Sequence, residues 1–170
     1  MLLGAHVSIS GSVDKAVDRA EDLGCTTFQI FTRNPRGWTA KPFKRGEVEE
    51  FRRKFEEYGF EVAVAHMPYL PNLASPDKSV YKKSVNSLME ELKRTERLGL
   101  PYLVLHVGSH LGKGIEGGIK RVAAGINKAF SKVDNDVMLL LENMAGQKNS
   151  VGSRFEDIRR IIDLIEDKSR

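Results

Sequence analysis

Hydrophobic and polar residues follow two regular patterns along the chain, and together these patterns predict an α/β fold. Five short apolar runs rich in β-branched and aromatic residues are typical of buried strands. These runs cover residues 2–7, 26–31, 61–66, 102–106 and 137–142. Between and after them, apolar residues recur every three or four positions, as in amphipathic helices. The expected helices cover residues 12–23, 47–58, 78–98, 115–131 and 154–165.

The alternation of strands and helices leaves two main architectures for the sheet. Parallel strands joined by helices form either a closed TIM-type barrel or a doubly wound open sheet. A dinucleotide-binding open sheet has a G-x-G-x-x-G loop after its first strand, whereas residues 6–11 read HVSISG. We therefore expect a TIM-type (β/α) barrel. Because eight βα units need about 250 residues, a chain of 170 residues should contain about five of them, in a single domain over residues 1–170.

Composition narrows the class of protein further. The sequence has no charge-poor apolar run near the roughly 20 residues that cross a membrane, and residues 1–4 lead into the first strand without a signal peptide. We therefore expect a cytoplasmic protein with no membrane partner. The single cysteine, Cys25, cannot form an internal disulfide and is expected to be a buried strand residue. A formal net charge of +4 is compatible with a polyanionic partner but does not identify one.

Three consecutive apolar runs end directly on side chains that bind metal ions. The third run ends on His66, the fourth on His106 and the fifth on Glu142. Because adjacent parallel strands lie about 4.8 Å apart, side chains at the same level on neighbouring strand ends should converge above the sheet. In a barrel this is the face that carries the active site. Two imidazoles and a carboxylate form a familiar catalytic zinc set, which leaves a fourth position for a water of lowered pKa.

Two loops beside these strand ends have unusual compositions. Residues 32–45 contain five basic residues, two aromatic residues and no acidic residue. Such a loop can pair with phosphates and stack on bases, although an ordinary solvated loop is the alternative. Residues 66–74 place apolar and aromatic groups on the same face. These groups could wedge between the base steps of DNA, or they could form a packed cap over the mouth of the barrel.

Four segments of the sequence resemble the endonuclease IV family, and they occur in the family's order. They are residues 4–8 (GAHVS), 31–38 (FTRNPRGW), 106–111 (HVGSHL) and 141–147 (LENMAGQ), and the resemblance extends over residues 1–170. It implies a TIM barrel with a trinuclear zinc site. It also implies hydrolysis of the phosphodiester on the 5′ side of an abasic site in double-stranded DNA, which is the reaction of an AP endonuclease in base excision repair.

The resemblance also implies roles for the metal-binding residues. His66, His106 and Glu142 match the ligands of one zinc ion, and the catalytic Glu142 bridges to a second. The family takes its remaining zinc ligands from later strands, beyond Arg170. We therefore expect this chain to complete one zinc site and to show little cleavage by itself. The open edges of the first and fifth strands should also favour self-association.

For DNA binding, the resemblance points to residues in the two loops. The family segments that match Arg36, Tyr69 and Leu70 enter the DNA at the lesion. From the basic, acid-free loop of residues 32–45 we also expect Arg33 to hold the duplex beside Arg36. Two alternative functions remain open. A metal-dependent sugar isomerase or epimerase would use the same barrel and ligand types but would have little use for the basic loop. A non-catalytic half-barrel that only binds DNA is the other alternative.

Overall fold

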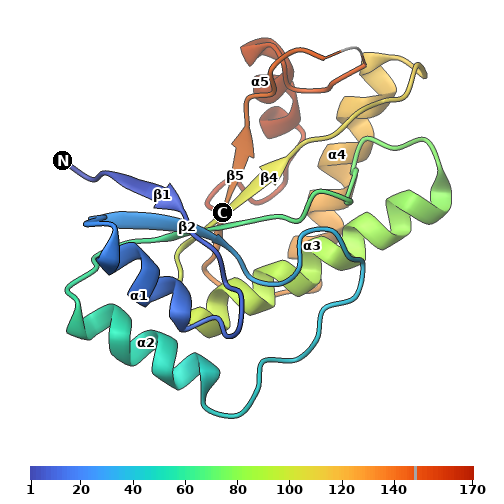
Figure 1. Ribbon diagram of the computed structural model, residues 1–170. Helices are drawn as coiled ribbons and strands as arrows, with labels where there is room; N and C mark the ends of the chain where they lie inside the picture. Colours follow the sequence, from blue (N-terminus) through green and yellow to red (C-terminus); the bar gives the residue numbers. More distant parts are fainter. Residues whose placement is uncertain (148) are drawn as a thin grey trace.

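Five parallel strands form one twisted sheet in the computed structural model, which describes residues 1–147 and 149–170 (Figure 1). The sheet has the order β1-β2-β3-β4-β5, with β1 (Gly4–His6), β2 (Thr27–Phe31), β3 (Val64–His66), β4 (Tyr102–His106) and β5 (Met138–Glu142). The helices are α1 (Lys15–Asp22), α2 (Glu47–Glu57), α3 (Lys78–Leu98), α4 (Ile115–Phe130) and α5 (Phe155–Asp163). Five successive βα units in sequence order form part of a TIM-type barrel, as predicted. Among the described helices, none is both long enough and apolar enough to cross a membrane.

Helix α3 shows how local sequence sets the ends of an element. Before its first turn, the side chain of Asp77 accepts a hydrogen bond from the backbone N–H of Val80 at 2.8 Å, which satisfies an otherwise unpaired donor. After its last turn, Gly99 adopts a left-handed conformation with φ of 76°, which ends the helix. The bounds predicted for this helix are confirmed, and so are those of β4.

Strands β1 and β3 are shorter than the hydrophobic pattern predicts. Strand β1 pairs with β2 only over Gly4–His6, and β3 pairs only over Val64–His66, where we expected residues 2–7 and 61–66. The apolar pattern continues beyond the hydrogen-bonded ladder, so it overestimates the length of these strands. Cys25 precedes β2 and is only half-buried, so the expectation of a buried strand residue is wrong.

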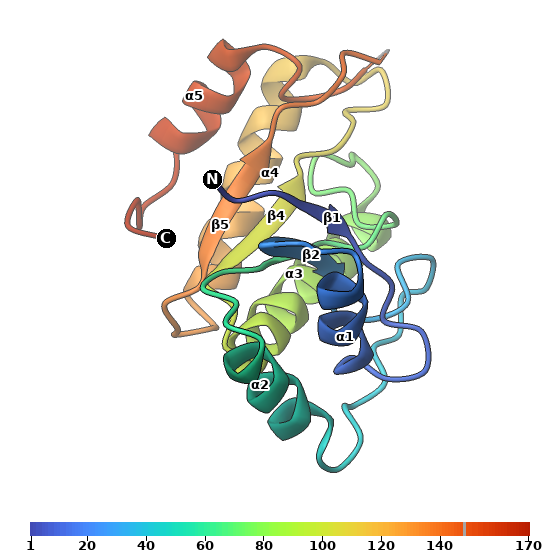
Figure 2. The same ribbon diagram turned by 60° about the vertical axis from the view of Figure 1, so that its left-hand side comes forward.

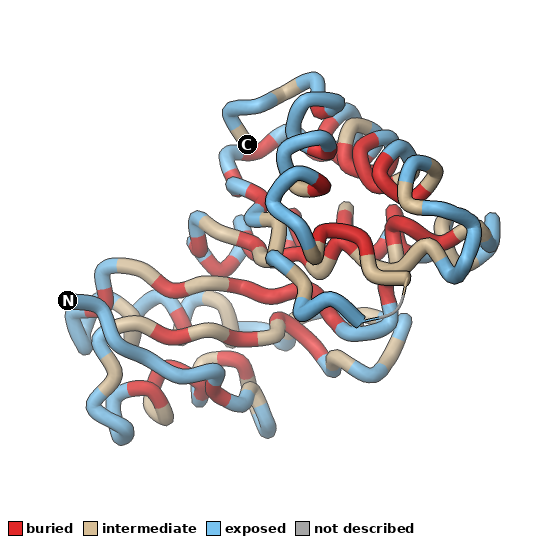
Figure 3. The backbone as a smooth tube through the Cα atoms, turned by 90° about the horizontal axis from the view of Figure 1, so that it is seen from above, coloured by how far each residue is buried: buried red, intermediate tan, exposed pale blue. Residues whose placement is uncertain are grey.

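The helices cover the outer face of the sheet and leave its inner face open (Figure 2). Leu103 and Leu105 of β4 are buried against the helices, and Phe28 and Ile30 of β2 lie in the same core. Figure 3 shows buried residues along the strands and on the inward sides of the helices. Alternate strand residues point to the inner face. The functional side chains described below lie on that face, at the carboxyl ends of the strands.

The two outer strands of the sheet have different surroundings. At β1, a side chain on Gly4 would place its Cβ 1.8 Å from the carbonyl oxygen of Thr27, so only glycine allows this close approach to β2. Beside β5, a groove of about 310 Å³ is lined mainly by apolar side chains from β5 and α5. Met138 and Leu140 in this groove are 41% and 36% exposed. Self-association through these edges stays a prediction.

Candidate metal centre and nucleic-acid surface

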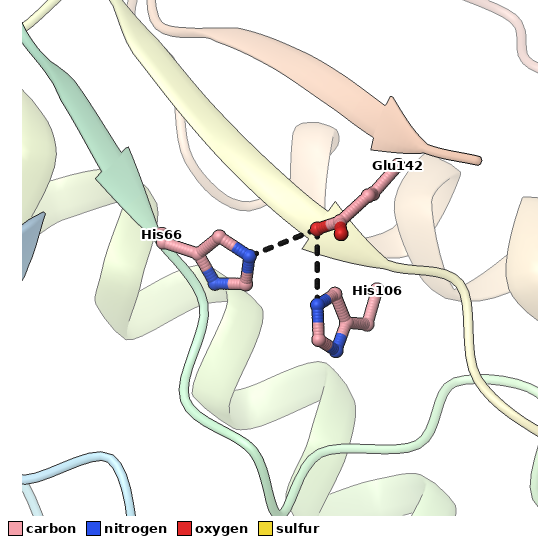
Figure 4. Close-up of side chains that lie close together, drawn as sticks. All are labelled: His66, His106 and Glu142. Atoms are coloured by element: carbon pink, nitrogen blue, oxygen red, sulfur yellow. Dashed lines mark hydrogen bonds and ion pairs between the residues drawn. The ribbon is translucent and has the colours of Figure 1, made fainter. Parts of the chain in front are cut away.

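The side chains of His66, His106 and Glu142 meet at the carboxyl ends of β3, β4 and β5 (Figure 4). The Nε2 atoms of His66 and His106 lie 2.9 Å and 3.0 Å from Oε2 of Glu142. One ligand atom from each residue lies within 4.8 Å of the other two. The convergence predicted from the strand ends is confirmed. Within residues 1–147 and 149–170, this is the one group of three or more such side chains with the spacing of a metal site.

The sequence predicts that the three residues lie at the same level of the sheet, and this prediction is wrong. His106 pairs in register with Glu142, but His66 pairs with Val104, two residues before the end of β4. Strands in a barrel are tilted, so neighbouring strand ends are staggered along the barrel axis. The His66 ring reaches across this step and packs edge-on against the His106 ring, with 4.7 Å between ring centroids.

Hydrogen bonding and burial prepare both imidazoles to act as ligands. Nδ1 of His66 lies 2.7 Å from the carbonyl oxygen of Met67, so this nitrogen carries the proton that is donated to the carbonyl. The other ring nitrogen of His66, Nε2, faces the cluster. Burial lowers the pKa of His106, an effect that the charge of Glu142 opposes and that His66 reinforces.

This arrangement brings three electron-pair donors together. The two ring nitrogens lie at hydrogen-bond distance from the carboxylate oxygen, and once deprotonated each nitrogen offers a lone pair beside that oxygen. A metal ion would accept all three lone pairs. The residues present therefore fit a metal ion, and their two nitrogen atoms and one oxygen atom are the donor types of a catalytic zinc site.

His6 lies beside this cluster without joining it. Its Nδ1 accepts a hydrogen bond from the side-chain amide of Gln29 at 2.8 Å, its partner in register on β2. The His6 ring centroid is 4.3 Å from that of Phe31 and 6.3 Å from that of His66. Burial, with a smaller effect of His66, lowers the pKa of His6. His6 therefore forms part of the packing around His66.

Arg36, Tyr69 and Leu70 are all exposed at the rim of this cluster. The backbone N–H of Tyr69 donates to the carbonyl oxygen of Pro35 at 3.0 Å, which joins the loop after β3 to the loop after β2. The Tyr69 ring packs edge-on against Phe31, with centroids 5.1 Å apart, and Phe31 packs in the same way against His66 at 5.5 Å. Aromatic contacts therefore connect the exposed rim to the metal-binding residues.

Arg33 lies inside the protein, so the prediction that it contacts DNA is wrong. Its side chain is 3% exposed, and its Nε donates to Oε1 of Glu91 at 2.6 Å. Its two terminal nitrogens donate to the carbonyl oxygen of Gly37 at 2.6 Å and to the hydroxyl of Ser87 at 2.7 Å. Because the guanidinium is used inside the protein on all three nitrogens, Arg33 supports the loop and does not reach a phosphate.

Sequence reasoning also missed two buried charged residues of α3 that lie near Arg33. Glu91 is fully buried, and Arg94 is 4% exposed. Burial raises the pKa of the Glu91 carboxyl, an effect that hydrogen bonds from Thr32 and Arg33 oppose. One signal was available in the sequence, because Glu91 lies three residues after Leu88 and therefore on the buried stripe of α3. An acidic residue at such a position needs a buried partner.

Asn72 joins the loop after β3 to the loop after β4. Its Oδ1 accepts from the backbone N–H groups of Ser109 at 2.9 Å and Ala74 at 3.1 Å, and its Nδ2 donates to the carbonyl oxygen of Ser109 at 2.9 Å. Gly108 has φ of 101°, and a Cβ there would lie 2.2 Å from Oδ1 of Asn72. Gly108 therefore leaves space for the Asn72 side chain and its hydrogen bonds between the two loops. His110 accepts from the N–H of Gly114 at 3.2 Å and belongs to the architecture of the same loop.

Comparison with known proteins agrees with this geometry. A family model described as a xylose isomerase-like TIM barrel matches residues 17–170. A probable endonuclease 4 from Methanoculleus marisnigri is 54% identical over 171 residues, which cover 100% of this chain and 61% of that protein. A probable endonuclease 4 from Nitrosopumilus maritimus is 53% identical over 163 residues, which cover 95% and 58%. The crystal structure of endonuclease IV from Thermus thermophilus matches with a TM-score of 0.85 and 38% identity, over 95% of this chain and 59% of that one.

These relatives are longer than this chain, which spans about 60% of their length. A D-tagatose 3-epimerase-like protein matches with a TM-score of 0.74 but only 16% identity, over 98% of this chain and 62% of that one. That likeness shows a shared fold and gives no further support to the epimerase alternative. The resemblance to endonuclease IV is confirmed. The chain therefore belongs to the xylose isomerase-like TIM barrel family, with endonuclease IV proteins as its relatives in sequence.

Proposed function

We propose that this chain provides the first zinc site and the DNA-binding rim of an endonuclease IV-type AP endonuclease. The reaction is hydrolysis of the phosphodiester on the 5′ side of an abasic site in duplex DNA. The observation that carries the proposal is the His66, His106 and Glu142 cluster, which lies beside an exposed rim that contains Arg36 and Tyr69. The names of the relatives in sequence agree with this activity.

In this proposal, His66, His106 and Glu142 hold one zinc ion. When bound, zinc acts as a Lewis acid on the phosphodiester and lowers the pKa of water. The protein holds the Nε2 lone pair of His66 toward the site through the hydrogen bond from Nδ1 to Met67. Glu142 makes both of its contacts to the histidines through Oε2. The resemblance implies that the same carboxylate would also hold a second metal ion. The trinuclear arrangement of the family is part of the proposal and involves ligands outside this chain.

The rim supports DNA as the substrate. Four basic residues of the loop after β2 remain exposed once Arg33 is set aside, namely Arg36, Lys41, Lys44 and Arg45. These charges can pair with phosphates, which a small sugar does not offer. Tyr69 and Leu70 are 56% and 39% exposed, and exposed apolar side chains next to a basic surface suit insertion between base steps at a lesion.

Metal analysis and DNA binding of residues 1–170 test this function. We expect about one tightly bound zinc ion per chain, and tighter binding to a duplex with one tetrahydrofuran abasic analogue than to the same duplex without it. Failure to bind zinc, or equal affinity for the two duplexes, would contradict the proposal.

A nicking assay then tests whether the active site is shared between residues 1–170 and the later strands of the barrel. Residues 1–170 should show little incision alone, and incision 5′ to the lesion should appear when the later strands of the barrel are added as a second chain. Full activity of residues 1–170 alone would contradict the expectation that this chain holds only part of the site.

A further inference from the structure

A buried network of polar and charged side chains lies beneath the loop that carries Arg36. We call Thr32, Arg33, Glu91 and Arg94 the Glu91 network. Oε1 of Glu91 accepts from Nε of Arg33 and Oε2 accepts from the hydroxyl of Thr32, both at 2.6 Å. All four residues are at most 5% exposed. The network therefore ties the end of β2 to the middle of α3 inside the protein.

Arg33 carries this connection into the turn that presents Arg36. Its Nη1 donates to the carbonyl oxygen of Gly37, so the side chain of Arg33 connects the two ends of the turn formed by residues 33–37. Within the turn, Oδ1 of Asn34 accepts from the backbone N–H of Arg36 at 3.0 Å. The backbone of Arg36 is therefore held between two contacts, while its side chain is exposed.

Arg94 holds the beginning and the end of the same segment. Its Nε and Nη2 donate to the hydroxyl and the carbonyl oxygen of Thr32 at 2.9 Å and 2.5 Å. Its Nη1 donates to the carbonyl oxygen of Lys41 at 3.0 Å, and its guanidinium lies 3.8 Å from the centre of the Phe43 ring. Residues 32–43 contain no helix or strand. Hydrogen bonds from buried side chains therefore hold this segment, because it has no regular backbone hydrogen bonding of its own.

We propose that Glu91 is a positioning residue for DNA recognition. Its carboxylate orients Arg33 and Thr32, and through them it holds residues 32–41 in the conformation that presents Arg36 and Trp38 to the duplex. A buried ion pair contributes little net stability compared with apolar packing, and its clearest benefit is one defined conformation. A preorganised loop loses less entropy on binding than a mobile one. This inference rests on the proposed DNA-binding function.

Trp38 offers a direct readout of the loop. It is the single tryptophan of the chain, lies within residues 32–41 and is 37% exposed, so its fluorescence reports on this loop and on its contact with Lys83 of α3. In Glu91→Gln, the carboxylate charge is lost with little change in shape. We expect quenching of Trp38 by acrylamide to increase, and the Kd for abasic duplex to rise on the order of tenfold. The matched control is Glu96→Gln, an exposed position on the same helix, which should leave both measurements unchanged.

Arg33→Lys distinguishes the role of the Arg33 hydrogen bonds from the role of its charge. It is also the variant to use if Glu91→Gln does not fold. Lysine keeps the positive charge but lacks the planar fork that reaches Glu91, Gly37 and Ser87 together. We expect Arg33→Lys to increase quenching and weaken binding as Glu91→Gln does. Folded variants with wild-type quenching, or with altered quenching but wild-type affinity, would overturn the positioning role. If the wild-type chain itself binds abasic duplex no better than plain duplex, the proposed function fails first, before any variant is compared.

Discussion

The cluster of His66, His106 and Glu142 and the neighbouring loop after β2 are held in place in different ways. Each residue of the cluster is the last residue of a strand, so the hydrogen-bonded ladder of the sheet places it. The loop has no ladder, and its conformation depends on Glu91, which lies 58 positions after Arg33 in the sequence. The backbone of the sheet positions the cluster, whereas buried side chains of α3, which is distant in the sequence, position the loop.

This difference implies that metal binding by the cluster and the conformation of the loop can be lost independently of each other. Loss of a ligand should abolish metal binding and leave the fold intact, because the strand ends remain paired. Loss of Glu91 should destabilise the fold and release the loop, while the metal ligands keep their register. The predictions below test this separation, from the largest expected effect to the smallest.

Replacement of the buried carboxylate should have the largest effect on stability. Glu91→Ala leaves Arg33 buried without its acidic partner and removes the nearby negative charge from the buried Arg94, so we expect the free energy of unfolding to fall by about 3–5 kcal/mol. Urea denaturation measures this change, and zinc binding by the folded fraction should be unaffected. The exposed Glu96→Ala on the same helix should change stability by less than about 0.5 kcal/mol. A loss below about 1 kcal/mol in Glu91→Ala would mean that the network is not a major support of the loop.

Replacement of a ligand should give the opposite result. His106→Ala removes one of three protein ligands, and we expect zinc affinity to fall by more than about 100-fold, because even the loss of a residue that only supports a ligand costs 10–100-fold. Stability without metal should change little, since the side chain of His106 is 31% exposed. Competition with a chelating indicator measures the affinity. His110→Ala is the control, because that histidine lies outside the cluster. Equal zinc affinity in both variants would remove His106 from the site.

The same difference explains what the sequence could predict. The convergence of His66, His106 and Glu142 could be predicted because each residue ends an apolar run, and because parallel pairing brings neighbouring strand ends together. Their stagger was missed, because strand tilt is a property of the whole sheet. Arg33 and Arg36 share one basic loop, and nothing near them in the sequence shows which one is buried. That depends on Glu91, whose contact with Arg33 exists only after α3 has packed against the end of β2.

At the rim, truncation of the two exposed side chains should affect lesion recognition. In the double variant Tyr69→Ala with Leu70→Ala, we expect the preference for abasic over plain duplex to fall by about 30-fold or more, because each stacked or wedged side chain contributes about 1–3 kcal/mol. Binding to plain duplex should remain, since it depends on phosphate contacts. Fluorescence anisotropy with both duplexes measures the preference. Leu164→Ala, 47% exposed near the end of α5, is the control. Equal losses on the two duplexes would indicate that Tyr69 and Leu70 only pack against the barrel.

The smallest expected effect concerns Arg36, and it tests whether the loop has one outward and one inward arginine. Each phosphate contact contributes about 0.9 to the slope of log K against log salt concentration. Arg36→Ala should therefore flatten that slope by about this amount, with wild-type stability and wild-type Trp38 quenching, because the Arg36 side chain is exposed. Arg53→Ala, an exposed arginine of α2 that pairs with Glu50 and Glu57, should leave the slope unchanged. An unchanged slope in Arg36→Ala would remove Arg36 from the phosphate contacts. The exposed lysines of the loop would then be the next side chains to test.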